Sequence, residues 1–243
     1  MIAVLALLRR DLRSASRSPL DLAYLVMGLV GWLLVARLVA GQASVRADAL
    51  RGLSIGLIGQ ASLCTLYVLA LQYRDYQSQA SIALELAPLP RLLPTLARCL
   101  ASAATVLASA LTLGALALLT RLMPGGLEAL PTLIPAALGL AWAAASVTAL
   151  GIAALALVVA EPRRLAACLS GLALALGLGC GRLSTQPLPR WQALAAHFSP
   201  IYYVIDASER LLSPSGLGRA VVADLLVLGL VGLAGLLLLS RKE

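Results

Sequence analysis

One short stretch of the sequence has the spacing of a catalytic motif. Gly52, Ser54 and Gly56 form G-x-S-x-G, the pattern that places a serine nucleophile on a tight turn in hydrolases. Such a serine needs a general base within hydrogen-bonding reach, and His197, the sole histidine, is expected in a loop rather than on a facing helix. Because the motif opens an apolar stretch rich in small residues, we favour a role in helix packing and keep proteolysis as an alternative.

The other reactive residue types are too sparse for cofactor chemistry. A phosphate-binding P-loop needs a lysine, and the only lysine is Lys242 in the C-terminal tail. A single histidine cannot supply a multi-histidine metal centre or a haem pair. The cysteines lack paired spacing and are interpreted as small buried hydrophobic residues: Cys64, Cys99, Cys168 and Cys180. We therefore expect no metal or cofactor on this chain and no ATPase site of its own.

Two charged residues near apolar runs are further candidates, since a charge in lipid is costly. Arg37 and Asp224 are predicted at similar depth near the outer ends of two runs, and we hypothesise that they pair. The alternative is that each side chain reaches the interface separately. No series of carboxylates crosses the predicted bundle, which weighs against a transporter driven by ions.

The elements that must position these residues are apolar helices. Hydrophobic residues make up 60% of the 243 residues and charged ones 12%, whereas about a quarter of a soluble domain is charged. Runs of about 20 apolar residues cross roughly 30 Å of hydrocarbon as helices, and Leu- and Ala-rich runs without polar alternation do not suit a barrel. We predict an all-α, polytopic membrane helix bundle in a single domain, with about six spans at roughly 20–40, 52–73, 99–120, 132–160, 165–181 and 218–240. Pro131 and Pro135 indicate that the fourth span starts later or is tilted.

The basic residues predict the orientation of the bundle. Residues 1–19 predict an amphipathic helix in the lipid interface, with leucines on one side and Arg9, Arg13 and Arg17 on a neighbouring side. With the N-terminus inside, most arginines next to spans lie on the cytoplasmic side, as the positive-inside rule requires. We expect a multi-pass protein of the plasma membrane, the inner membrane of a bacterium, with both termini cytoplasmic. The arginines form no groove interleaved with aromatic residues, so no nucleic-acid partner is expected.

Two connections are longer than simple turns. The inner one, over 74–98, carries an amphipathic stretch at 78–86 followed by three prolines, which predicts a short helix at the cytoplasmic membrane surface. The outer one, over 182–217, predicts two helices before the last span, at 189–197 and 199–212.

The second outer helix has clear end signals. Ser199 is placed to cap it and Pro200 to occupy its first turn. We expect Asp206, Glu209 and Arg210 on its polar side, so that the helix lies at the outer membrane surface or dips into it.

In this order, three segments resemble the membrane subunits of type-2 ABC exporters, the permeases of drug, lipid and polysaccharide export. The basic start is similar to the helix before that family's first span: Leu8-Arg9-Arg10-Asp11-Leu12-Arg13. An inner segment resembles the family's cytoplasmic region, with Ser81-Ile82 replacing the usual Gly-Thr and Arg98 replacing a Lys: Leu84-Glu85-Leu86-Ala87-Pro88. The most specific match is similar to the family's Asn-Pro-x-x-Tyr-x-x-Asp-x-x-x-Arg: Ser199-Pro200-Ile201-Tyr202-Tyr203-Val204-Ile205-Asp206, with Arg210.

The resemblance implies two functional regions and several partners. The coupling region, which would receive force from a separate ATP-binding subunit, comprises Asp75, Ser78, Glu85, Leu86 and Pro88. The extracellular gate comprises Pro200, Tyr203, Asp206 and Arg210. ATP and Mg²⁺ would bind the partner subunit, and a second copy of the permease or a sister permease would complete the path through the lipid. Gly177 and Gly181, at helical spacing, are a possible dimer seam, with packing inside the chain as the alternative.

On this interpretation the chain moves an amphiphilic small molecule, lipid or peptide out of the cytoplasm. Aromatic residues are only 4% of the chain, which disfavours a polysaccharide path lined by aromatic side chains. The nearest alternative is the haem-exporter membrane subunit of cytochrome c maturation, which has a similar inner segment. A rhomboid-like intramembrane serine protease, whose Ser54 would react with a fluorophosphonate, and a membrane scaffold without a transport path are further alternatives.

Overall fold

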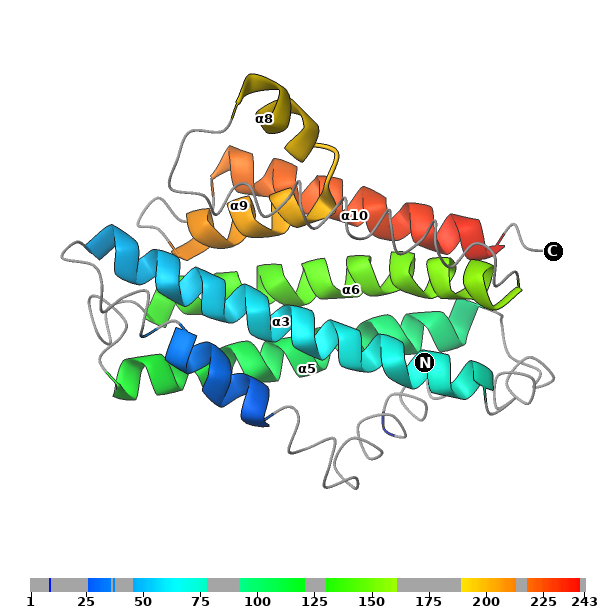
Figure 1. Ribbon diagram of the computed structural model, residues 1–243, viewed down its shortest axis with the longest axis horizontal. Helices are drawn as coiled ribbons and strands as arrows, with labels where there is room; N and C mark the ends of the chain where they lie inside the picture. The colour runs from blue at the N-terminus through cyan, green and yellow to red at the C-terminus, as the bar shows by residue number, and fades with distance from the viewer. Residues whose placement is uncertain are drawn as a thin grey trace.

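The chain folds into a bundle of helices. The computed structural model describes Arg9, Arg37 and residues 26–35, 46–77, 92–120, 130–160, 189–212 and 218–240. After a short apolar helix, Val26–Val35, these ranges form α3 (Arg46–Gln77), α5 (Leu92–Leu119), α6 (Leu130–Ala160), α8 (Arg190–Ala196), α9 (Pro200–Leu212) and α10 (Arg219–Ser240) (Figure 1). The described residues contain no strand, which confirms the all-α prediction.

Four helices are long and apolar enough to cross a membrane. They are the part of α3 from Gly52 to Tyr76, α5, α6 from Pro131 to Ala156, and α10. Each overlaps a predicted span, so the composition fits a multi-pass membrane protein. Of the first predicted span only Val26–Val35 and Arg37 are described. The predicted span at 165–181 and the interfacial helix at 1–19, apart from Arg9, lie outside the described residues.

Two helices begin earlier than the predicted spans, each with a proline in its first turn. α5 begins at Leu92 and includes Pro94, because a proline in the first turn forfeits no hydrogen bond. α6 begins at Leu130, with Pro131 in its first turn and Pro135 inside. The sequence left a later start or a tilt open for this span, and the helix itself already begins at Leu130. Pro135 removes one backbone hydrogen bond, and the helix continues past it to Ala160.

Contacts between the helices define how they run. The Asp75–Arg98 and Cys64–Ser109 contacts make α3 and α5 antiparallel. Gly28 faces Leu63 and Gly59 faces Trp32, so Val26–Val35 also runs opposite to α3. By contrast, α6 and α10 run in the same direction, because a Cβ on Gly229 would meet Trp142 and one on Gly235 would meet Leu150. Figure 1 shows the two helices side by side with this common direction.

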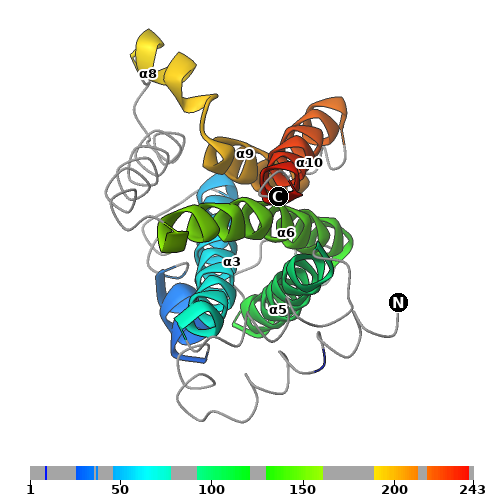
Figure 2. The ribbon, with the colours of Figure 1, turned by 90° about the vertical axis from the view of Figure 1, so that its right-hand side faces the viewer.

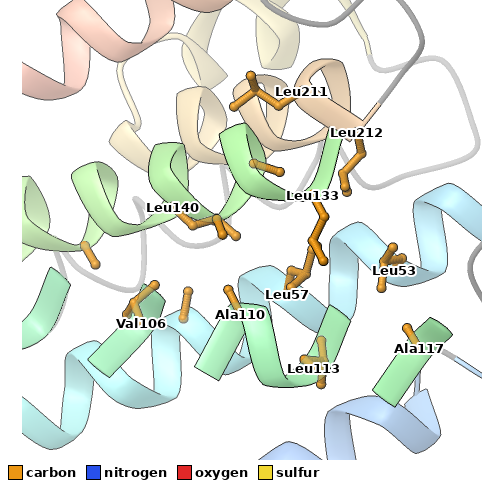
Figure 3. Packing of buried hydrophobic residues seen from close by; sticks show 14 of the residues in the cluster. Leu53, Leu57, Val106, Ala110, Leu113, Ala117, Leu133, Leu140, Leu211 and Leu212 are labelled. Atoms are coloured by element: carbon orange, nitrogen blue, oxygen red, sulfur yellow. The ribbon is translucent and has the colours of Figure 1, made fainter. Parts of the chain in front are cut away.

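The centre of the bundle is filled by leucine, valine and alanine from several helices. Leu57 of α3, Leu113 of α5 and Leu133 of α6 are fully enclosed, and Leu211 of α9 joins the same cluster (Figure 3). Small residues let the helix axes approach. A Cβ added to Gly235 would lie 2.7 Å from backbone atoms of α6, so only glycine fits there. The glycines of α10 therefore serve close packing within the chain.

Candidate functional site

The second outer helix is packed into the bundle. α9 lies against α6, α10 and α3, and it runs back beside the first part of α10 (Figures 1 and 2). Its buried side is formed by Ile205, Asp206, Ala207, Ser208, Leu211 and Leu212. A helix resting on the membrane surface would bury only one apolar stripe against lipid. α9 is instead a part of the helix bundle directly before its last long apolar helix.

The start of α9 follows the prediction from the sequence. The backbone N–H of Ile201 donates to Oγ of Ser199 at 3.3 Å, and the N–H of Tyr202 donates to the Ser199 carbonyl at 3.1 Å. Pro200 is the first helical residue, where its missing N–H has no partner to lose. The predicted cap and first turn are confirmed.

Tyr203 connects α9 to the turn that follows α8. Its hydroxyl donates to the carbonyl oxygen of His197 at 2.9 Å. The His197 ring lies 4.5 Å from that of Tyr202, and the Tyr202 and Tyr203 rings meet edge to face at 5.5 Å. These contacts fix the angle at which the chain enters α9.

Asp206 and Arg210 pair one turn apart on α9. Arg210 Nη2 donates to Asp206 Oδ2 at 2.7 Å. The Asp206 side chain is only 3% exposed and that of Arg210 is 41% exposed, so the acid points into the bundle while the guanidinium reaches its surface. The sequence predicted Asp206 on the polar side of a helix at the membrane surface or dipping into it, and the structure places this side chain in the contact with α10. The apolar pattern predicted a lipid-lying helix, whereas α9 packs its Asp206 side against α10.

Asp224 of α10 is the acid that faces Asp206. Its carboxyl lies at hydrogen-bonding range of the Asp206 carboxyl, with Arg210 and His197 as the other charged or ionisable groups that act on it. Asp224 is 8% exposed, and its Oδ2 has no hydrogen-bond partner among the described residues. Arg37 is exposed and forms no ion pair with Asp224, so the hypothesised Arg37–Asp224 pair does not form. The hypothesis rested on similar depth in the membrane, and depth does not tell which side of the bundle each residue faces.

A narrow apolar crevice adjoins this group between α6, α9 and α10. It is lined mainly by small and aliphatic residues and has no space for a water molecule: Gly139, Leu140, Ala143, Val204, Ala207, Ser208, Leu211 and Leu228. Its walls are therefore in close contact in this conformation.

At the opposite end of the bundle, Asp75 of α3 pairs with Arg98 of α5. Both side chains are largely buried, at 17% and 5% exposure, so the pair joins the two helices where the inner connection leaves and returns. The sequence-based interpretation placed Asp75 against a partner subunit, but its carboxylate accepts from Arg98 within the chain. The other predicted coupling residues, Ser78, Glu85, Leu86 and Pro88, and the predicted dimer residues Gly177 and Gly181, lie outside the described residues.

The hydrolase-like motif lies within a helix. Ser54 is buried inside α3, where G-x-S-x-G forms part of a continuous helix rather than a strand-to-helix turn. The His197 ring hydrogen-bonds the Ala193 carbonyl at 2.7 Å in its own turn. The described structure forms no Ser54–His197 pair.

α8 presents large apolar side chains away from the rest of the described bundle. Trp191, Leu194 and Phe198, in α8 and the turn after it, are 65%, 70% and 90% exposed. Figure 2 shows α8 projecting outward before the start of α9. An aromatic and aliphatic surface next to membrane-length helices suits the lipid interface.

Among the described residues no three His, Cys, Asp or Glu side chains gather as a metal site would require. Comparisons with protein-family models, with curated proteins and with solved structures found no match.

Proposed function

We propose that this chain is the membrane-spanning permease subunit of an ATP-driven exporter that moves an amphiphilic small molecule, lipid or peptide out of the cytoplasm. The observation that carries the proposal is α9, a short helix folded into the bundle beside α10, in which the buried Asp206 pairs with the partly exposed Arg210. A helix of this kind can move against its neighbours without breaking a membrane span. That property suits a gate.

The direction of the helices supports the span count on which the proposal depends. α6 and α10 run the same way, which supports the proposal that the apolar run at 165–181 crosses back between them. The antiparallel pairs Val26–Val35 with α3 and α3 with α5 also support the proposed six crossings with both termini on one side.

The proposed mechanism couples the two ends of the bundle. An ATP-binding subunit in the cytoplasm would act on the connection at 74–98, which begins and ends near the buried Asp75–Arg98 pair. Because this pair joins α3 to α5, displacement of one helix would carry the other with it. α3 and α6 both contact α9, so tilting them would open the apolar crevice beside α10. A second permease, identical or related, would complete the path.

The test is to purify the tagged chain from its own membrane in mild detergent and to measure ATP hydrolysis. The chain has no ATPase motif, so hydrolysis that orthovanadate inhibits must come from an associated subunit. The variant Glu85→Arg, in the proposed coupling region, should reduce the co-purified activity several-fold. Glu128→Arg, in the connection between α5 and α6 at the other end of the bundle, is the matched control.

Three results would overturn the proposal. A homogeneous preparation of the chain with no associated ATP hydrolysis would exclude an ABC permease. Stoichiometric haem would favour the haem-exporter alternative, and fluorophosphonate labelling of Ser54 in the folded chain would favour the protease. We expect neither bound haem nor labelling of Ser54. The burial of Ser54 within α3 argues against the labelling.

A further inference from the structure

Three ionisable side chains meet where α9 packs against α10. Asp206 and Asp224 are acids buried in an otherwise apolar contact, and Arg210 is the base that pairs with Asp206. Arg210 therefore serves Asp206, and the structure shows no arginine or lysine as a direct partner of Asp224 among the described residues.

The unmatched acid is Asp224. Arg210 donates to Oδ2 of Asp206, while the carboxyl of Asp224 faces that of Asp206 and its own Oδ2 receives no hydrogen bond from the described residues. Ionised carboxylates only accept hydrogen bonds, so two that face each other have no donor between them. A buried arrangement of this kind needs a positively charged donor, because two like charges in contact are strongly unfavourable where water is excluded.

No second base is a direct partner of the Asp224 carboxyl among the side chains that the structure describes. On the α9 side, His197 and the partly exposed Arg210 attract the Asp224 carboxylate electrostatically. Glu209 on α9 is a further acid. α6 has no ionisable residue between Leu130 and Ala160, and Arg219 at the start of α10 is exposed. The first two turns of α3 contribute Arg46, Asp48 and Arg51 by sequence.

We propose that Asp206 and Asp224 together bind one small cationic hydrogen-bond donor at the contact between α9 and α10. Two sources share this chemistry: a proton held between the carboxyls, and the primary ammonium group of a transported amphiphile. The ammonium source rests on the proposed export function, whereas the proton source is independent of it. Either occupant removes the repulsion between the acids, and its departure restores that repulsion at the contact between α9 and α10.

The adjoining crevice fits an occupant with apolar neighbours. Ala207 follows Asp206 on α9, and Leu228 lies one turn after Asp224 on α10, and both line the crevice. An alkyl chain attached to the ammonium group would therefore find aliphatic side chains directly beside the carboxyl pair once α9 moves.

The experiment uses the full chain in lipid nanodiscs, as wild type and as the variants Asp224→Asn, Asp206→Asn and Glu209→Gln. One arm records the infrared carbonyl band of protonated carboxylic acids during acidification in amine-free buffer. The other measures the midpoint of thermal unfolding in n-butylammonium chloride, compared with sodium chloride at equal ionic strength and with neutral n-butanol. Glu209→Gln is the matched control, because it removes an acid of α9 that is outside the pair.

The other Asp and Glu residues also contribute to the infrared band on acidification, so a proton site predicts one component of it that the wild type and Glu209→Gln share and that either Asp-to-Asn variant abolishes. An ammonium site predicts that n-butylammonium raises the unfolding midpoint by about 2–4 °C in the same two proteins only. A wild-type chain that shows neither signal overturns the proposal without reference to any variant. Signals that persist in both Asn variants also overturn it, and because the variants change different helices, one that folds is sufficient for the comparison.

Discussion

Asp75 and Arg98 show how a charge pair can be a structural part of an apolar bundle. Arg98 is 4% exposed, and its guanidinium donates to the Asp75 carboxylate. Taking two charges out of water costs several kcal/mol, and the pair offsets that cost only while both members are present. At the other end of the bundle, Arg210 pairs with the buried Asp206 in the same way, but the Arg210 side chain is partly exposed.

Removing one member of the inner pair is therefore expected to be costly. Arg98→Gln should lower the free energy of unfolding by about 3–5 kcal/mol, because it removes the charged donor that pairs with the largely buried Asp75 carboxylate. Denaturation in mixed detergent micelles, followed by circular dichroism, measures the loss. The exchanged double variant Asp75→Arg with Arg98→Asp should regain part of it.

A loss no larger than that of Arg190→Gln, an exposed arginine at the start of α8, would show that the inner pair contributes little. Surface charges of that kind usually change stability by less than about 0.5 kcal/mol.

At the scale of the elements, the sequence predicted the helices well and their surroundings less well. The cap at Ser199, the start at Pro200 and the four long apolar helices all follow from local signals: a side-chain acceptor, a missing N–H and uninterrupted hydrophobic runs. The burial of Asp206 does not follow from such signals. A polar stripe on a helix is expected to face water, and only the position of α10 shows that it faces another acid, Asp224.

The partners of charged residues were hard to predict for the same reason. Arg37 and Asp224 share a predicted depth but face different surroundings, and a single sequence carries no information on rotation about the helix axes. The G-x-S-x-G spacing shows a related limit, since the same three residues suit a catalytic turn and a packed helix, and here they lie within α3.

The contact between α6 and α10 gives a prediction at this scale. Gly235→Ala should lower the free energy of unfolding by about 1–3 kcal/mol, because its Cβ would lie 2.7 Å from backbone atoms of Ala149 and Leu150, which cannot turn aside as a side chain can. Thermal unfolding in detergent, monitored by light scattering and intrinsic fluorescence, reports the change.

Gly31→Ala is the matched control, since nothing lies within 4 Å of a Cβ at that position. It should be neutral or slightly stabilising, because alanine favours a helix over glycine by up to about 1 kcal/mol. Equal effects of the two substitutions would contradict the close packing of α10 on α6.

At the scale of the whole molecule, the directions of the helices predict which ends lie on the same side of the membrane. Asp75 pairs with Arg98, so the end of α3 and the start of α5 lie together, and the end of α5 lies at the far end of the bundle. The arrangement of arginines predicts that the Asp75–Arg98 end is cytoplasmic.

Single cysteines test this orientation in a chain whose four native cysteines are replaced by alanine or serine. A membrane-impermeant maleimide applied to intact spheroplasts should label Thr120→Cys, at the end of α5, and leave Gln77→Cys, at the end of α3, unlabelled. Permeabilised cells should label both. Labelling of Gln77→Cys but not Thr120→Cys in intact spheroplasts would reverse the orientation and remove the basis for an outer gate at α9.

The central proposal is that an ATP-binding subunit inside the cell and the α9 contact outside it belong to one machine. The most direct test measures ATP hydrolysis by the purified complex with Arg210→Gln, which loosens α9 from the far side of the bundle, beside Arg210→Lys, which keeps the charge near Asp206. We predict that Arg210→Gln changes the vanadate-sensitive rate several-fold while the subunits remain associated, and that Arg210→Lys stays near the wild-type rate. An unchanged rate in a complex of Arg210→Gln that is intact and folded would contradict the account.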